Sequence, residues 1–172
     1  MTLVEILSDK SIKKMAARKM ITEGILDGRY SMDEIATAVK VLKENKVATI
    51  LEAIEEISNK KLADLSREYL EFAMGYIASP DNSCKREASR IVGNLAAQYP
   101  QTIREAIPAL LENTKSEGTV VRWGSAYALS RIIVLKEYCD SNLYEKLLSI
   151  CEDEEENGVK HQYIKALKKI KR

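Results

Sequence analysis

The sequence has little of what strands, tight turns or chemical sites require. Only seven glycines and three prolines occur among 172 residues, too few for a protein built from many strands and tight turns. The three cysteines are an odd number without a CxxC pair, which argues against a disulfide framework or a zinc site. With one histidine and no glycine-rich phosphate-binding motif, we expect no metal and no cofactor.

Neither charge nor hydropathy directs the chain to nucleic acid or to membrane. The formal net charge is +1, and there is no run of about 18 apolar residues that could cross a bilayer. Charged residues follow the first few apolar ones at once, so we expect no signal peptide and a cytoplasmic location. Apolar residues make up 45% and charged residues 31%, as in globular proteins, and the length predicts a single domain over residues 1–172.

A repeated pattern of apolar and small residues organises the chain. From Val121, such residues recur four, seven, eight and eleven positions later, and the same offsets apply from Cys84 and from Val159. These three anchors lie 37 and 38 residues apart, and a basic residue follows each of them. Lys46 and Lys13 are upstream anchors that are themselves polar. The offsets are those of one face of an α-helix, so we predict helices whose core face carries these positions.

Further helices are predicted between these. They cover residues 32–44, 62–78, 102–113 and 143–151, and turn and capping residues separate them from the helices that follow. Pro108 falls inside one of them and should bend or shorten its first turn. The prediction is an all-α fold of about four to five antiparallel helix pairs, which stack into a right-handed α-α superhelix because one pair is too small to fold alone.

The best-formed repeats resemble a known family pattern. Residues 121–132, VRWGSAYALSRI, are similar to the second helix of a HEAT-like repeat, V-R-x-x-A-A-x-A-L-G-x-I, and residues 84–95, CKREASRIVGNL, match it with glycine at the expected place. Residues 159–170 fit loosely, with Tyr163 where a small residue is usual. The resemblance implies a HEAT or armadillo-like solenoid that holds partners. It also implies an acid in the preceding turn that pairs with the basic residue after the anchor. Asp81 is such an acid, whereas the turn before Val121 offers only Glu117.

The outer face of the repeated helices carries the candidate binding residues. Positions two, six, nine and thirteen after each anchor lie about 180° from the core positions, and in solenoids such a face usually lines the concave surface. The candidate partner-binding residues on or beside this face are Arg86, Arg90, Trp123, Tyr127, Arg131, His161 and Lys165. Aromatic rings among cations suit an acidic protein segment or a nucleic-acid backbone. The alternative is that Trp123 and Tyr127 pack against the neighbouring repeat.

Two functions are compatible with this face. The first is a non-enzymatic scaffold that docks a protein partner, for example an acidic segment. The second is a DNA-binding protein or DNA glycosylase, because the HEAT-like alkylpurine glycosylases resemble this chain and use a basic groove with aromatic residues and a catalytic aspartate. No aspartate lies beside Trp123 on the predicted face, which favours the scaffold. No residue is predicted to be catalytic, and Cys84 and Cys151 occupy core-like positions where thiols pack rather than react.

Overall fold

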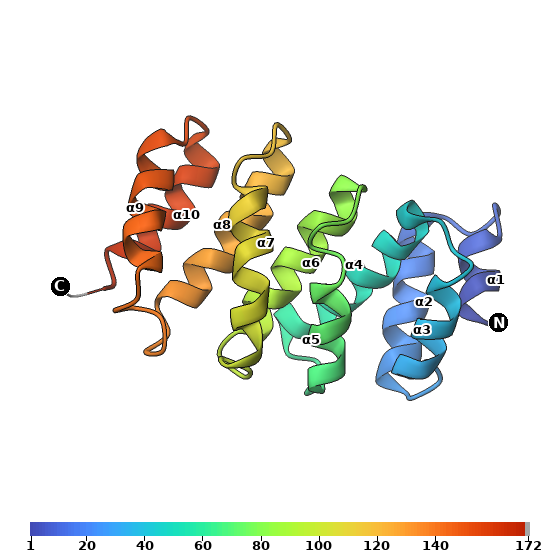
Figure 1. Ribbon diagram of the computed structural model, residues 1–172. Coiled ribbons are helices and arrows are strands. Elements are labelled where there is room, and N and C mark those ends of the chain that lie inside the picture. The colour runs from blue at the N-terminus through green and yellow to red at the C-terminus, as the bar shows by residue number, and fades with distance from the viewer. Residues whose placement is uncertain (171–172) are drawn as a thin grey trace.

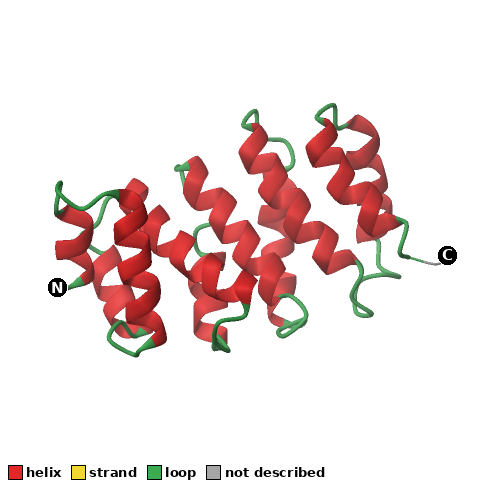
Figure 2. Cartoon of the chain, turned by 180° about the vertical axis from the view of Figure 1, so that it is seen from behind, coloured by secondary structure: helices red, strands yellow, loops and turns green. Residues whose placement is uncertain are grey.

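The structure is a computed structural model that describes residues 1–170, and these residues fold into five successive helix pairs. Both views show an elongated row of pairs, with α1 at one end and the α9–α10 pair at the other (Figure 1 and Figure 2). The first helices of the pairs are α1 (Leu3–Ser8), α3 (Met32–Val39), α5 (Arg67–Met74), α7 (Ile107–Asn113) and α9 (Leu143–Asp153). The second helices are α2 (Lys14–Leu26), α4 (Glu44–Lys60), α6 (Asn82–Leu95), α8 (Thr119–Ile133) and α10 (Asn157–Leu167). The predicted solenoid of four to five pairs is confirmed.

Most of the repeated core positions are buried as predicted, whereas Met20, Leu167 and Ile170 are only half-buried. The five residues from Cys84 at the repeat offsets are 0–4% exposed, and those from Val121 are all fully buried. Ile50, Ala53, Ile54 and Ile57, predicted from the polar anchor Lys46, are also fully buried. The buried apolar side chains form one cluster that extends from Leu3 to Ala166, so stacking makes a continuous core out of pairs that could not fold alone.

The second helices form the inner stack of the solenoid. The most extensive contacts join α2 to α4, α4 to α6, α6 to α8 and α8 to α10. At the α6–α8 crossing, glycines let the two backbones approach closely. A Cβ on Gly93 would lie 3.0 Å from the Cα of Ala128, and one on Gly124 would lie 3.1 Å from the Cα of Arg86. This crossing therefore fixes the relative positions of the outward-facing residues of α6 and α8.

Two of the predicted first helices are shorter than the sequence pattern indicated. The helix expected over 32–44 ends at Val39. The chain turns there, and the amides of Val41 and Leu42 both donate hydrogen bonds to the Ala38 carbonyl. The helix expected over 62–78 covers only Arg67–Met74. The preceding helix α4 ends at Lys60, Lys61 after it adopts a left-handed conformation (φ 53°), and the Leu62 amide donates to the Ile57 carbonyl, so residues 62–66 connect the two helices without being helical. In both segments, apolar residues of a turn complete the core and mimic helical periodicity.

The remaining first helices agree better with expectation. Pro108 lies in the first turn of α7, and the segment before it, Thr102–Ala106, is a 3₁₀ helix, so the proline shortens this helix as predicted. The helix α9 extends two residues beyond the predicted end at Cys151. Among residues 1–170, no helix combines the length and the apolar character needed to cross a membrane.

Candidate functional site

The outward positions of α6, α8 and α10 form one surface, which we call the second-helix face. It contains all seven candidate binding residues, on three helices that contact one another in sequence. The structure exposes them to different degrees. Arg131, His161 and Lys165 are exposed, Arg86, Arg90 and Trp123 are half-buried, and Tyr127 is buried. The candidates therefore divide into residues free to meet a partner and residues that serve the fold.

Tyr127 belongs to the inter-repeat packing rather than to the open surface. Its side chain is only 7% exposed, because its ring lies over the gap left by Gly93 of α6. The hydroxyl donates to the Oδ1 atom of Asn94, and the Arg131 guanidinium covers the ring at 3.4 Å from its centroid. Burial raises the pKa of Tyr127. Of the two alternatives for Tyr127, packing against the neighbouring repeat is the one observed, because Gly93 in the last turn of α6 leaves room for the ring.

Arg90 is not a free cation. Its Nη2 atom lies 3.0 Å from Glu55 Oε1 on α4, and its Nη1 atom lies 3.7 Å from Glu87 Oε2 on α6. Arg86 in turn places its Nε atom 2.8 Å from Glu87 Oε1. Burial raises the pKa of Glu87 although both arginines act against it. The positive charges predicted on α6 are thus largely neutralised within the chain.

The same neutralisation continues toward the N-terminus. Glu52 and Glu56 of α4 form ion pairs with lysines of α2 and of α4 itself. Lys14 Nζ lies 2.6 Å from Glu52 Oε1, and Lys60 Nζ lies 2.7 Å from Glu56 Oε1. A shallow groove of about 440 Å³ on this part of the surface is lined almost entirely by these ion-paired residues. The sequence shows acids on α4, but their pairing with the following repeat depends on an inter-helix register that the sequence does not reveal.

Trp123 is the aromatic residue of the face that keeps accessible surface. It is half-buried, its ring centroid lies 5.5 Å from the Arg90 guanidinium carbon, and it is 5.4 Å from the Tyr127 ring. Arg90 is held by two glutamates, so it fixes the indole in place from one side. On α10, the second helix that follows α8, His161 and Lys165 are exposed, and neither takes part in an ion pair among residues 1–170. The result is an aromatic platform beside an exposed histidine and an exposed lysine.

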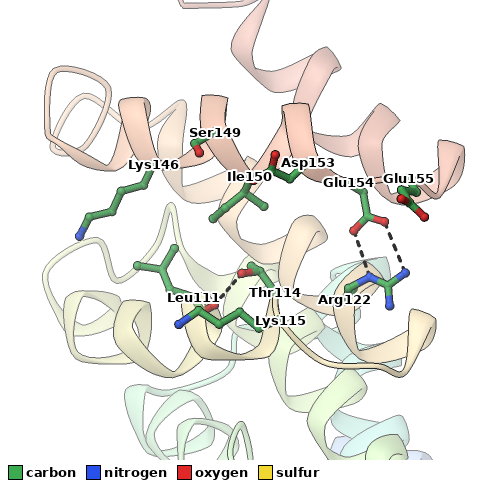
Figure 3. A pocket seen from close by; sticks show the side chains of 10 residues that line it. All are labelled: Leu111, Thr114, Lys115, Arg122, Lys146, Ser149, Ile150, Asp153, Glu154 and Glu155. Atoms are coloured by element: carbon green, nitrogen blue, oxygen red, sulfur yellow. Dashed lines mark hydrogen bonds and ion pairs between the residues drawn. The ribbon is translucent and has the colours of Figure 1, made fainter.

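A separate cleft lies in the layer of first helices. It has a volume of about 730 Å³ between α7 and α9, with Leu111 and Ile150 facing each other across it (Figure 3). At one end Arg122 holds Glu154 through its Nε and Nη2 atoms, at 3.1 and 3.4 Å, and donates to the Ser116 carbonyl. Burial would raise the pKa of Glu154, but the Glu156 amide and the Arg122 guanidinium outweigh it, so this pKa lies below its ordinary value.

The acid–base ladder implied by the HEAT-like resemblance takes another form here. Asp81 caps α6 by accepting from the Cys84 amide at 2.9 Å. Glu117 offers its main-chain carbonyl to Arg122 at 3.1 Å, while the carboxylate partner is Glu154 of the next repeat. The expected pairing of Asp81 with the following basic residue is therefore wrong, because its carboxylate accepts from an unpaired amide at the start of α6 instead.

Two kinds of chemical group bear on catalysis in the described residues, metal ligands and reactive thiols. No group of three or more His, Cys, Asp or Glu side chains within residues 1–170 is placed to hold a metal ion. Cys84 is fully buried, and burial raises its pKa to about 12, so its thiol stays protonated. Cys151 is also buried, which likewise raises its pKa.

Comparison with known proteins identifies the fold. No protein-family model and no curated protein matches the sequence. Among solved structures, an engineered protein matches with a TM-score of 0.66 at 18% identity, over 98% of this chain and 77% of its own. A designed armadillo repeat protein matches with a TM-score of 0.66 at 16% identity, over 98% of this chain and 81% of its own. Another, in complex with the peptide (KR)4, matches with a TM-score of 0.64 at 17% identity, over 98% and 80%. The chain therefore has the armadillo-like α-α solenoid fold that its HEAT-like repeats indicated.

Proposed function

We propose that this protein is a non-enzymatic scaffold that binds an extended segment of a protein partner across its second-helix face, centred on Trp123. The observation that carries the proposal is the fixed, partly exposed indole of Trp123. An accessible tryptophan on a rigid surface is a frequent centre of binding energy in protein interfaces. A designed relative in fold was solved with a bound peptide, which supports this mode of use for the solenoid.

A protein segment suits the face better than a nucleic acid. The cations of α6 are already paired with Glu55 and Glu87, and the carboxylates of α4 border the same surface. A phosphate backbone that crossed the helices would meet these acids, and the net charge of +1 gives little long-range attraction. Local contacts to one segment avoid both difficulties.

The test uses Trp123 as its own reporter. Because it is the only tryptophan, intrinsic fluorescence reports directly on this platform. A displayed library of random peptides of about 12 residues, which span roughly 40 Å when extended, can cross four second helices spaced by about 10 Å. We expect selected peptides to shift the fluorescence of Trp123 and to lose at least tenfold in affinity for Trp123→Ala (about 1.4 kcal/mol or more).

Matched variants separate a binding role from a general effect. Val41→Ala removes another exposed apolar side chain, 72% exposed in the turn between α3 and α4, and should leave peptide binding unchanged. Selected peptides that bind Trp123→Ala as well as wild type would show that the platform is not the site. Salt-sensitive binding of labelled duplex or single-stranded DNA, lost in Trp123→Ala, would instead favour the nucleic-acid function.

A further inference from the structure

Two junctions between successive second helices share one contact. In both, the residue nine positions after one anchor faces the residue six positions after the next anchor. At the α4–α6 junction, Glu55 stands at the first position and Arg90 at the second, with 3.0 Å between Oε1 and Nη2. At the α6–α8 junction, Gly93 faces Tyr127, whose Cδ1 atom would be 3.0 Å from a Cβ on the glycine. These two junctions therefore define a pair of facing positions, whereas at the α2–α4 junction Thr22, nine positions after Lys13, donates to Glu56 instead.

At the α8–α10 junction these positions hold a cation but no acid. They are occupied by Ser130 and Lys165, the equivalents of Glu55 and Arg90. The Ser130 hydroxyl is buried and has no hydrogen-bond partner among residues 1–170. Arg131 follows it directly and is exposed, and neither α8 nor α10 contains an acidic residue. This junction carries the positive half of the Glu55–Arg90 pair without its negative half.

We propose that an acidic side chain of the partner completes this junction. Resting on the proposed scaffold function, the inference names its partner: an acidic protein segment that lies across α8 and α10. One of its carboxylates is received by Lys165 beside Ser130, in the place that Glu55 takes at the α4–α6 junction. The segment then continues over Trp123 and stops at Arg90, because the surface beyond is closed by the chain's own ion pairs.

A direct test is to place the missing carboxylate in the chain itself by substituting Ser130. In Ser130→Glu the new side chain should pair with Lys165 as Glu55 pairs with Arg90, and so compete with the partner. Glu55 shows that an acid can occupy the equivalent position of another repeat, and it is as little exposed as Ser130, both at 7%. Ser130→Gln has nearly the same size without the charge and is the matched control.

The probes are two fluorescein-labelled octapeptides, (Glu-Ser)4 and (Lys-Ser)4. Their binding is measured by fluorescence anisotropy at low salt. Wild type should bind (Glu-Ser)4 in preference to (Lys-Ser)4. Ser130→Glu should weaken binding of (Glu-Ser)4 by about tenfold or more, and Ser130→Gln by less than about threefold. The exposed Lys165→Glu should also lose about tenfold, whereas Lys40→Glu, an equal charge change after α3, should not.

The outcomes separate this inference from the scaffold function. No binding of (Glu-Ser)4 up to about 1 mM, or equal losses in Ser130→Glu and Ser130→Gln, would overturn the acidic partner. If (Lys-Ser)4 binds better and quenches Trp123, the scaffold function stands and the acidic partner falls. If library selection also yields no Trp123-dependent peptide, both fall.

Discussion

Replacing Tyr127 decides between its packing role and a partner-binding role. A buried aromatic side chain covers roughly 150–250 Å², which at about 25 cal/mol per Å² corresponds to roughly 4–6 kcal/mol. Measured losses for aromatic-to-alanine changes in cores are about 3–5 kcal/mol. Because the Tyr127 ring is 7% exposed and fills the space over Gly93, we expect Tyr127→Ala to lower the free energy of unfolding by about 3–5 kcal/mol.

The assay is urea unfolding followed by circular dichroism, with two companion variants. Tyr127→Phe removes only the hydrogen bond to Asn94 and should cost about 1 kcal/mol. Val134→Ala truncates an exposed residue (40%) at the end of the same stripe and should change stability by less than about 0.5 kcal/mol. If Tyr127→Ala costs no more than Val134→Ala, Tyr127 is a surface residue and the packing argument is refuted.

Two further predictions concern the contacts that join neighbouring repeats. Glu154→Gln breaks the ion pair with Arg122 and should cost about 1–3 kcal/mol at pH 7 in the same unfolding assay. Since the folded pKa of Glu154 lies below its ordinary value of 4.5, its contribution is full above that value and is lost as the pH falls through the folded pKa. The stability difference between wild type and Glu154→Gln should therefore shrink below pH 4.5, and a difference that stays constant down to pH 3 would contradict this. Gly93→Val places branched carbons against the Ala128 Cα and should lower the free energy of unfolding by about 2–3 kcal/mol. Gly158→Ala, with open space around it, should be neutral or slightly stabilising. Equal melting temperatures for the two variants would show that α6 and α8 are not in close contact.

The fold could be predicted because its information is local and repeated. The offsets from Cys84 and Val121 name buried residues correctly, since the same helix face meets the core in every repeat. The ends of the helices were harder to predict from the sequence. Val39 and Leu42 keep helical spacing across a turn, and only the left-handed conformation of Lys61 shows why the next helix begins at Arg67.

The candidate site was predictable as a surface but not as a set of free residues. Position on a helix is enough to place Trp123, His161 and Lys165 on the outer face. It does not show that Arg90 is held by Glu55, a residue 35 positions away, because that contact depends on the register between two helices. The sequence left the packing and binding roles of Tyr127 both open for the same reason, since its burial depends on the glycine at position 93 of the neighbouring helix.

The stacking of second helices has a mechanical consequence. Among residues 1–170, the extensive contacts of the second helices join each helix to its neighbours in the row. A force or a torque applied at α10 therefore reaches the rest of the molecule through one junction after another. The curvature of such a solenoid is the sum of the small rotations at its successive junctions.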